Sequence, residues 1–181
     1  MVTERYVILD RDGTINVDSD DFIKSPEEWL PLAGSLEAIA LLNRHGYKVV
    51  VISNQSGIAR GLFDLAMLEA IHAKMLRLTA EAGGRIEAIY FCPHGPNDIC
   101  DCRKPLDGLF LRFAAEMEAD LSRTFAIGDS LRDIQAAESA GAKPILVRTG
   151  KGEKTAIDNP HLNVPIFDNL YDAATHIVST R

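Results

Sequence analysis

The sequence predicts an α/β fold, a three-layer α/β/α sandwich around a mainly parallel, Rossmann-like sheet. Short apolar, β-branched runs alternate along the chain with segments of helical periodicity, and this alternation implies parallel strands joined by helical crossovers. No internal repeat or linker divides the chain. Its 181 residues, of which 46% are hydrophobic, fit one core, so we expect a single domain over residues 1–181.

Five short apolar segments are typical of buried strands. They lie at residues 6–9, 48–52, 88–91, 124–127 and 145–147. Pro144 limits where the last of these strands can begin, because proline has no N–H to donate to a sheet. In parallel sheets the reactive groups gather at the carboxyl ends of the strands. The residues that follow each strand are therefore the candidates for function.

Two helices are expected in the first half of the chain. Ser35 can cap the first of them, which ends near Gly46, and Asp64 can cap a longer second helix. His45 and His72 lie on these helices, and both are expected at the surface or at the boundary of the core.

Two more helices are expected in the second half. One carries its apolar side chains at residues 109–117, and the other begins after Asp129 and ends at Gly141. Residues 149–163 are polar, and we expect them to form a mobile loop before a short final strand and helix.

The strongest chemical signal is the run Asp10-Arg11-Asp12-Gly13-Thr14, which begins where the first strand ends. Two carboxylates separated by one residue can point into one crevice, and Gly13 permits a sharp exit of the chain. The segment Gly128-Asp129-Ser130 follows the fourth strand, and Asp133 lies one helical turn further on. Three or four acidic side chains are therefore expected at one edge of the sheet.

Such a cluster requires a hard cation, because like charges repel and Mg²⁺ prefers oxygen ligands. Phosphoryl transfer uses the same arrangement, in which the metal screens an anionic nucleophile from an anionic substrate. A carboxylate that attacks phosphorus forms an acyl phosphate, which water then hydrolyses. The acidic cluster therefore favours a Mg²⁺-dependent phosphatase.

Four sequence elements together resemble the haloacid dehalogenase (HAD) superfamily of phosphatases. They are the DxDGT run that begins at Asp10, Ser53 at the end of the second strand, Lys104 before the third helix, and the GDxxxD segment at residues 128–133. The resemblance spans residues 6 to about 148. Asp-Gly-Thr or Gly-Asp-Ser alone is often only a turn or a helix cap, but four elements in this order form a specific pattern.

The resemblance implies a role for each matched residue. Asp10 would be the nucleophile and a Mg²⁺ ligand, and Asp129 would be another ligand. Asp12 would protonate the leaving alcohol and later deprotonate water, while its backbone carbonyl holds the metal. Ser53 would hydrogen-bond the transferring phosphoryl oxygens, and Lys104 would balance their charge.

A second metal site is predicted in the loop at residues 92–102, which reads C-x-H-x₅-C-x-C. Its four ligands match tetrahedral Zn²⁺ in type and number, and they leave no open position, so the zinc would be structural. It would order the loop and present Arg103 and Lys104 to the substrate. The alternative is a surface loop with free thiols. The ligands would be Cys92, His94, Cys100 and Cys102.

Substrate selection is expected to come from loops, because the chain leaves no room for a cap domain at either usual position. Asparagine and glutamine can bind a polyol, and arginine offers a planar fork for a second phosphate or for sugar hydroxyls. The candidate substrate-binding residues are Asp18, Asp21, Asn54, Gln55, Ser56, Arg60 and Arg103.

The runs DRDGTIN, SNQSGIARG, CPH and CDCRKP are similar to a narrower family, the heptose bisphosphate 7-phosphatases. That resemblance implies a role in making ADP-heptose for lipopolysaccharide or surface glycans. The histidinol-phosphate phosphatases are the alternative, because the cationic amine of their substrate would suit the acidic loop at residues 18–21. Ser130, where some relatives carry lysine, leaves the exact substrate and anomer open, and Trp29 could cover the site or only anchor its loop.

Composition excludes several classes of protein. The net charge of −7 argues against general binding to nucleic acid or to anionic membranes. No apolar run reaches the roughly 20 residues that span a bilayer, and the first residues lack a signal-peptide pattern. A non-enzymatic zinc-loop module for nucleic acid would need a basic patch that the sequence lacks. We expect a monomeric cytoplasmic enzyme for a small phosphorylated metabolite.

Overall fold

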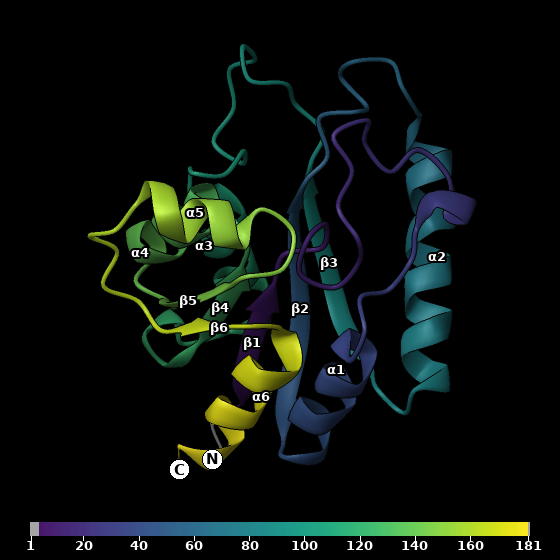
Figure 1. Cartoon of the computed structure of the whole chain (residues 1–181). Coiled ribbons are helices and arrows are strands. Elements are labelled where there is room, and N and C mark those ends of the chain that lie inside the picture. The colour runs from purple at the N-terminus through teal and green to yellow at the C-terminus, as the bar shows by residue number, and fades with distance from the viewer. Residues whose placement is uncertain (1–3, 181) are drawn as a thin grey trace.

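The computed structural model describes residues 4–180, which form one parallel sheet between two layers of helices (Figure 1). All neighbouring strands pair in parallel, in the order β3-β2-β1-β4-β5-β6. This arrangement confirms the predicted α/β/α fold. The strands are β1 (Arg5–Leu9), β2 (Tyr47–Asn54), β3 (Ile86–Cys92), β4 (Phe125–Gly128), β5 (Lys143–Val147) and β6 (Ile166–Phe167).

The helices cover both faces of this sheet, because alternate strand residues point to opposite sides. The helices are α1 (Ser35–Arg44), α2 (Leu65–Glu81), α3 (Gly108–Met117), α4 (Leu131–Ala140), α5 (Gly152–Asp158) and α6 (Leu170–Ser179). Val7 and Leu9 of β1 belong to the core under α1, α2 and α6, whereas Tyr6 and Ile8 belong to the core under α3 and α4.

Strand order places a crevice at the carboxyl end of β1. The chain continues from β1 to β2 and β3 on one side, and it returns to β4 and β5 on the other side. Such a reversal leaves a gap between neighbouring crossovers where ligands bind. The loops after β2 and β3 project from this same end of the sheet (Figure 1). The residues after β1, β2, β3 and β4 therefore surround one place.

Two local predictions are wrong. Ser35 does not cap α1, because Gly34 occupies the cap position with φ of 79°, and the Ser35 hydroxyl donates instead to the Ile15 carbonyl at 2.6 Å. Residues 149–163 are not simply a loop, since they include α5. The Thr155 hydroxyl of α5 donates to the Asp129 carbonyl at 2.9 Å, so a tertiary contact stabilises this short helix.

The cap predicted for α2 is confirmed, and burial answers the question left open for Trp29. The Asp64 side chain caps α2 by accepting from the Met67 N–H at 2.8 Å. Trp29 does not cover the site, because it is fully buried in the hydrophobic core. Within residues 4–180 no cap domain is inserted after β1 or after β2. Nor does that part of the chain contain a helix both long and apolar enough to cross a membrane.

Candidate active site

Three carboxylates meet at the carboxyl ends of β1 and β4. One oxygen from each of Asp10, Asp129 and Asp133 lies within 4.8 Å of the others. Asp10 directly follows β1, and its N–H donates to the Ile127 carbonyl of β4 at 2.9 Å. The pairing of β1 with β4 therefore brings together acidic residues that are more than a hundred positions apart in the sequence.

Two glycines make room for the Asp129 carboxylate. A Cβ atom on Gly13, where φ is +83°, would lie 2.1 Å from Asp129 Oδ2, and one on Gly150 would lie 2.3 Å from the same atom. The Lys151 N–H donates to this oxygen at 2.8 Å. Any larger residue at either glycine would therefore displace the carboxylate.

Asp133 has a different role, because both of its oxygens already have partners. Its Oδ2 accepts from the N–H groups of Asp129 and Ser130, each at 3.1 Å, and completes a capping box at the start of α4. Its Oδ1 lies 2.6 Å from the Lys104 ammonium. Asp133 thus shapes the turn that carries Asp129, and Asp10 and Asp129 keep oxygens for a metal.

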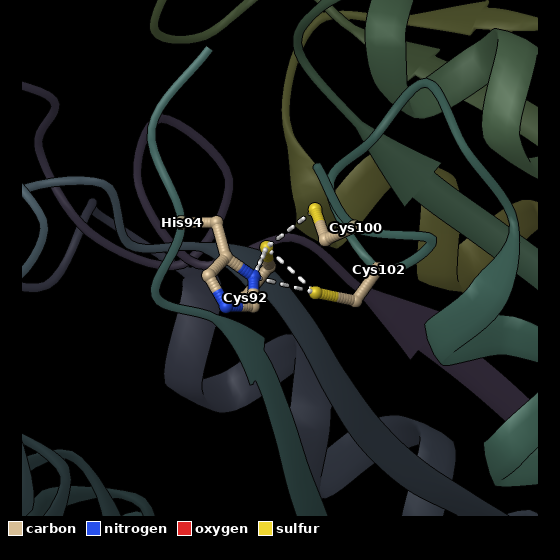
Figure 2. A group of neighbouring side chains, drawn as sticks. All are labelled: Cys92, His94, Cys100 and Cys102. Carbon is tan, nitrogen blue, oxygen red and sulfur yellow. Dashed lines mark hydrogen bonds between the residues drawn. The ribbon is translucent and has the colours of Figure 1, made fainter. Parts of the chain in front are cut away.

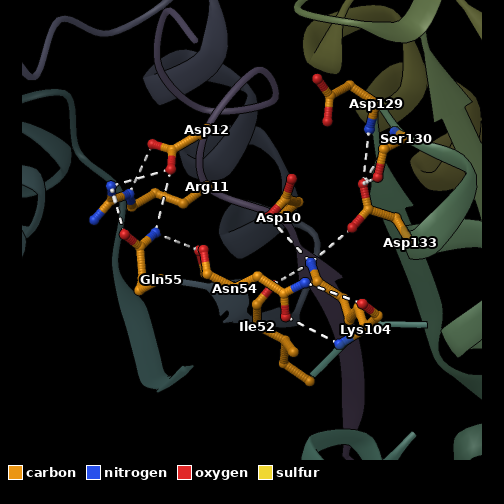
Figure 3. A network of polar contacts seen from close by, with 11 residues as sticks. Asp10, Arg11, Asp12, Ile52, Asn54, Gln55, Lys104, Asp129, Ser130 and Asp133 are labelled. Carbon is orange, nitrogen blue, oxygen red and sulfur yellow. Dashed lines mark hydrogen bonds and ion pairs between the residues drawn. The ribbon is translucent and has the colours of Figure 1, made fainter. Parts of the chain in front are cut away.

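Lys104 neutralises part of this cluster from a buried position (Figure 3). Its Nζ atom also lies 3.1 Å from Asp10 Oδ1 and donates to the Ile52 carbonyl at 2.8 Å. Asn54 holds the lysine backbone at both ends, since its Oδ1 accepts from the Lys104 N–H at 2.9 Å and its Nδ2 donates to the Lys104 carbonyl at 3.1 Å. Asn54 was predicted to bind a polyol, but both polar atoms of its amide bond to the Lys104 backbone and position that residue.

The crowding of carboxylates raises two pKa values. Burial and the neighbouring Asp133 raise the pKa of Asp10 to about 7, and burial and Asp10 raise the pKa of Asp129 to about 9. Burial opposes the charge of Lys104, but Asp10 and Asp133 raise its pKa above the ordinary value. The single ammonium of Lys104 therefore cannot neutralise all three carboxylates. A divalent cation that prefers oxygen ligands would neutralise the remaining negative charge.

Asp12 lies outside this cluster, with its carboxylate turned toward Arg11 and Gln55 (Figure 3). It accepts from Arg11 Nε at 2.9 Å, from Asn16 Nδ2 at 2.9 Å and from Gln55 Nε2 at 3.2 Å. Burial alone would raise the pKa of Asp12, but Arg11 and these hydrogen bonds hold it below its ordinary value. Asp12 nevertheless lines the same cavity as Asp10 and Asp129.

A cavity of about 210 Å³ connects these groups. Most predicted site residues line it, namely Asp10, Asp12, Asp18, Asn54, Ser56, Arg60, Arg103, Lys104 and Asp129. Three others do not: Asp21 is exposed, and Ser53 and Gln55 are buried beside the cavity and bonded to each other at 2.7 Å. Arg132 and Lys151 line the wall although the sequence analysis missed them. Arg132 follows the end of β4 and Lys151 follows the end of β5, each by four residues, so their positions after strand ends could have identified them as candidates.

The four predicted zinc ligands converge in the loop after β3. Figure 2 shows their side chains turned toward one centre, and one ligand atom from each lies within 4.8 Å of the others. His94 Nδ1 lies 3.4 Å from Cys92 Sγ and 3.3 Å from Cys102 Sγ, and the Cys92 and Cys100 sulfurs are 3.9 Å apart. A zinc tetrahedron with bonds of about 2.3 Å has sulfur–sulfur edges of about 3.8 Å, which the Cys92–Cys100 pair matches, whereas the Cys92 and Cys102 sulfurs lie closer, at 2.8 Å. The ligand types and their convergence are therefore compatible with a closed zinc site, in which the Cys92 and Cys102 sulfurs would have to move apart.

Comparisons with known proteins agree with this site. A family model described as HAD-hydrolase-like matches residues 101–173. The D-glycero-β-D-manno-heptose-1,7-bisphosphate 7-phosphatase of Pseudomonas aeruginosa is 48% identical over 177 residues, which cover 98% of this chain and 99% of the relative. The enzyme of the same name from Bordetella bronchiseptica is 56% identical over 151 residues, 83% of this chain and 84% of the relative. The chain belongs to this family.

A solved structure of this phosphatase family extends the match to three dimensions. The crystal structure of D,D-heptose 1,7-bisphosphate phosphatase from B. bronchiseptica, complexed with magnesium and phosphate, has a TM-score of 0.95 and 49% identity. The alignment covers 98% of this chain and 99% of the other. The chain is therefore a phosphatase with the HAD-like fold, as the motifs predicted.

Proposed function

We propose that this phosphatase removes the 7-phosphate of D-glycero-β-D-manno-heptose 1,7-bisphosphate and so serves the synthesis of ADP-heptose. The proposal rests on one observation above all, which is that Asp10, Asp129 and Lys104 share the wall of one cavity, where the Lys104 ammonium lies 3.1 Å from Asp10. Relatives whose names specify the β anomer of this substrate match between 80% and 98% of the chain. We therefore extend the preference to the β anomer here.

The charges around the cavity favour a substrate with two phosphates. Besides Lys104, the cavity is lined by Arg60, Arg103, Arg132 and Lys151, in a protein whose net charge is −7. One phosphoryl group needs the nucleophile and the metal, so further cations suit a second phosphate that stays on the sugar. Lys104 and Lys151 already pair with carboxylates of the lining, so the arginines would supply the contact that a lysine would provide in place of Ser130.

We propose Mg²⁺ as the catalytic cofactor, held by Asp10, Asp129 and the backbone carbonyl of Asp12. When bound, it screens the negative charges of nucleophile and phosphate from each other. Asp10 then attacks the phosphorus, the bond from phosphorus to the C7 oxygen breaks, and Asp12, which must carry a proton at this step despite its low pKa in the free site, gives that proton to the oxygen. Water next attacks the phosphorus of the aspartyl phosphate and loses a proton to Asp12. The bond from phosphorus to the Asp10 oxygen breaks, so orthophosphate leaves and Asp10 is restored.

Other residues support these steps. Lys104 contacts Asp10 at 3.1 Å, where it would offset charge on the transferring group. We keep Ser53 as a proposed phosphoryl contact, because its hydroxyl lies at the end of β2, next to the residue whose carbonyl binds Lys104. The zinc proposed for the loop after β3 would be structural. Arg103 Nη1 donates to the His94 carbonyl at 3.3 Å, so an ordered loop would also position this arginine.

The acidic loop gives the histidinol-phosphate alternative little support. Asp18 and Asp20 line the cavity, but Lys151 Nζ lies 3.7 Å and 3.8 Å from their carboxylates. A cationic amine would have to displace this lysine from both carboxylates, whereas a sugar bisphosphate carries no cation that needs them. The observed pairing therefore favours the bisphosphate.

Comparison of substrates tests the proposal. We would measure orthophosphate release with Mg²⁺ from both anomers of heptose 1,7-bisphosphate, from histidinol phosphate and from fructose 1,6-bisphosphate. The β heptose bisphosphate should give the highest kcat/KM, and Asp10→Asn should lose activity by about 10⁴-fold while it keeps the fold. Preference for histidinol phosphate would overturn the substrate, and an active Asp10→Asn variant would overturn the covalent mechanism.

A further inference from the structure

Arg11 is fully buried, although it is a charged residue between the two aspartates of the opening motif. Its Nε and Nη2 atoms donate to the two carboxylate oxygens of Asp12 at 2.9 Å and 3.1 Å. Its Nη2 also donates to Gln55 Oε1 at 3.3 Å, and its Nη1 lies 3.2 Å from Nε2 of His72. Arg11 therefore connects Asp12 to helix α2, which carries His72.

The chemistry of arginine decides the state of His72. A guanidinium has only donors and keeps its charge, so the contact at Nη1 requires His72 Nε2 to accept. His72 must then be neutral, with its hydrogen on Nδ1. Only 8% of His72 is exposed, and burial together with Arg11 lowers its pKa to about 4. The sequence analysis expected a surface or boundary residue, whereas the structure makes His72 a buried hydrogen-bond acceptor.

The orientation of Asp12 depends on this arrangement. Arg11 supplies two of the donors that hold its carboxylate, one on each oxygen, and Asn16 and Gln55 supply the others. A general acid contributes only when its oxygen is held near the reacting atom, and small errors of position are costly. Whatever fixes the plane of the Arg11 guanidinium therefore also fixes Asp12.

We infer that His72 is a positioning residue for the acid–base step, because it accepts from Arg11 and keeps that guanidinium aligned with Asp12. The inference rests on the proposed role of Asp12 as general acid and base. Loss of the acceptor would leave a buried N–H of a charged group without a partner, which is unfavourable. Arg11 would then turn to find another acceptor, and Asp12 would lose its two-point contact.

Three variants test the inference. His72→Leu removes the acceptor, His72→Gln places an amide oxygen where Nε2 lies, and Ile71→Val, a buried neighbour on α2, controls for packing. With heptose 1,7-bisphosphate we expect His72→Leu to lower kcat by about tenfold or more, with KM changed by less than about twofold. His72→Gln should recover most of kcat, and Ile71→Val should match the parent.

Binding of orthophosphate with Mg²⁺, followed by calorimetry, separates positioning from structural damage. This binding needs Asp10 and the metal but no proton transfer, so His72→Leu should bind orthophosphate as the parent does. If His72→Leu does not fold, His72→Asn replaces it, because the shorter amide cannot reach Arg11.

Three results would overturn the inference: parental kcat in His72→Leu, equal losses in His72→Leu and His72→Gln, or a parallel loss of orthophosphate binding. Asp12→Asn tests the underlying role separately. Full activity in Asp12→Asn would remove the acid–base assignment itself, whereas an inactive Asp12→Asn beside a fully active His72→Leu would remove only the role of His72.

Discussion

The ammonium group of Lys104 lies 3.1 Å from a carboxylate oxygen of Asp10, although 94 positions separate the two residues in the chain. The same ammonium contacts Asp133 at 2.6 Å, and the side chains of all three residues are at least four-fifths buried. Charges can be buried at this depth only when they are paired. The pair therefore couples the stability of the fold to the charge of the site.

Lys104→Met should destabilise the protein and abolish its activity. Removal of the cation leaves the carboxylates of Asp10 and Asp133 facing each other, and breaking a buried pair costs about 3–5 kcal/mol. Urea denaturation without metal would measure the loss. The matched control is Lys154→Ala, an exposed pair with Asp158 on α5, which should change stability by less than about 0.5 kcal/mol. Equal effects of both variants would contradict the role given to Lys104.

Gly13→Ala should weaken Mg²⁺ binding and lower the stability of the fold. The added Cβ would lie 2.1 Å from Asp129 Oδ2 and displace a proposed ligand. Gly83→Ala is the control, because Gly83 also has positive φ, of +84°, but its Cβ would meet nothing within 4 Å. Both variants should lose about 1–2 kcal/mol from backbone strain. Calorimetric titration with Mg²⁺ should show weakened binding for Gly13→Ala alone, and parental binding in that variant would refute the ligand assignment.

Cys102→Ser should lose zinc, because three ligands cannot complete the tetrahedron that four side chains frame. Elemental analysis of purified protein would give about one zinc per chain for the parent and much less for the variant. Ile99→Ala, a fully exposed position in the same loop, should keep its zinc. Zinc content in Cys102→Ser equal to that of the parent would refute Cys102 as a ligand, and a parent without zinc would leave the loop as one with free thiols.

Acid should weaken the fold through His72. The pKa of His72 is about 4 in the folded protein, whereas a histidine in the unfolded chain has its ordinary pKa of 6.5. Between these two pH values only the unfolded chain takes up the proton. Stability should therefore fall as the pH drops from about 6.5 to about 4, by on the order of 3 kcal/mol. His72→Gln should reduce this slope in urea titrations, while His161→Gln, at an exposed position, should keep it. An unchanged slope in His72→Gln would show that His72 is charged in the fold.

The main elements of the site could be predicted because each follows an apolar run. Asp10, Asn54 and Asp129 stand at or beside the ends of strands that the sequence shows clearly. The start of a helix was harder to predict where backbone conformation determines it. Gly34, with its left-handed backbone, takes the cap position expected for Ser35. Helix α5 escaped prediction because its seven residues carry no apolar stripe and depend on Asp129 for a contact.

Amino-acid order by itself determined the class of fold, the acidic motif that begins at Asp10 and the Cys/His cluster proposed for zinc, since apolar periodicity and short-range spacing encode all three. Only the tertiary structure decided that Asn54 holds Lys104, that Arg132 and Lys151 face the cavity, and that His72 accepts from Arg11. The reason is that a hydrogen-bond partner or a cavity wall is set by how distant segments pack. A local pattern shows which groups a side chain offers, but the surrounding fold determines which of them it uses.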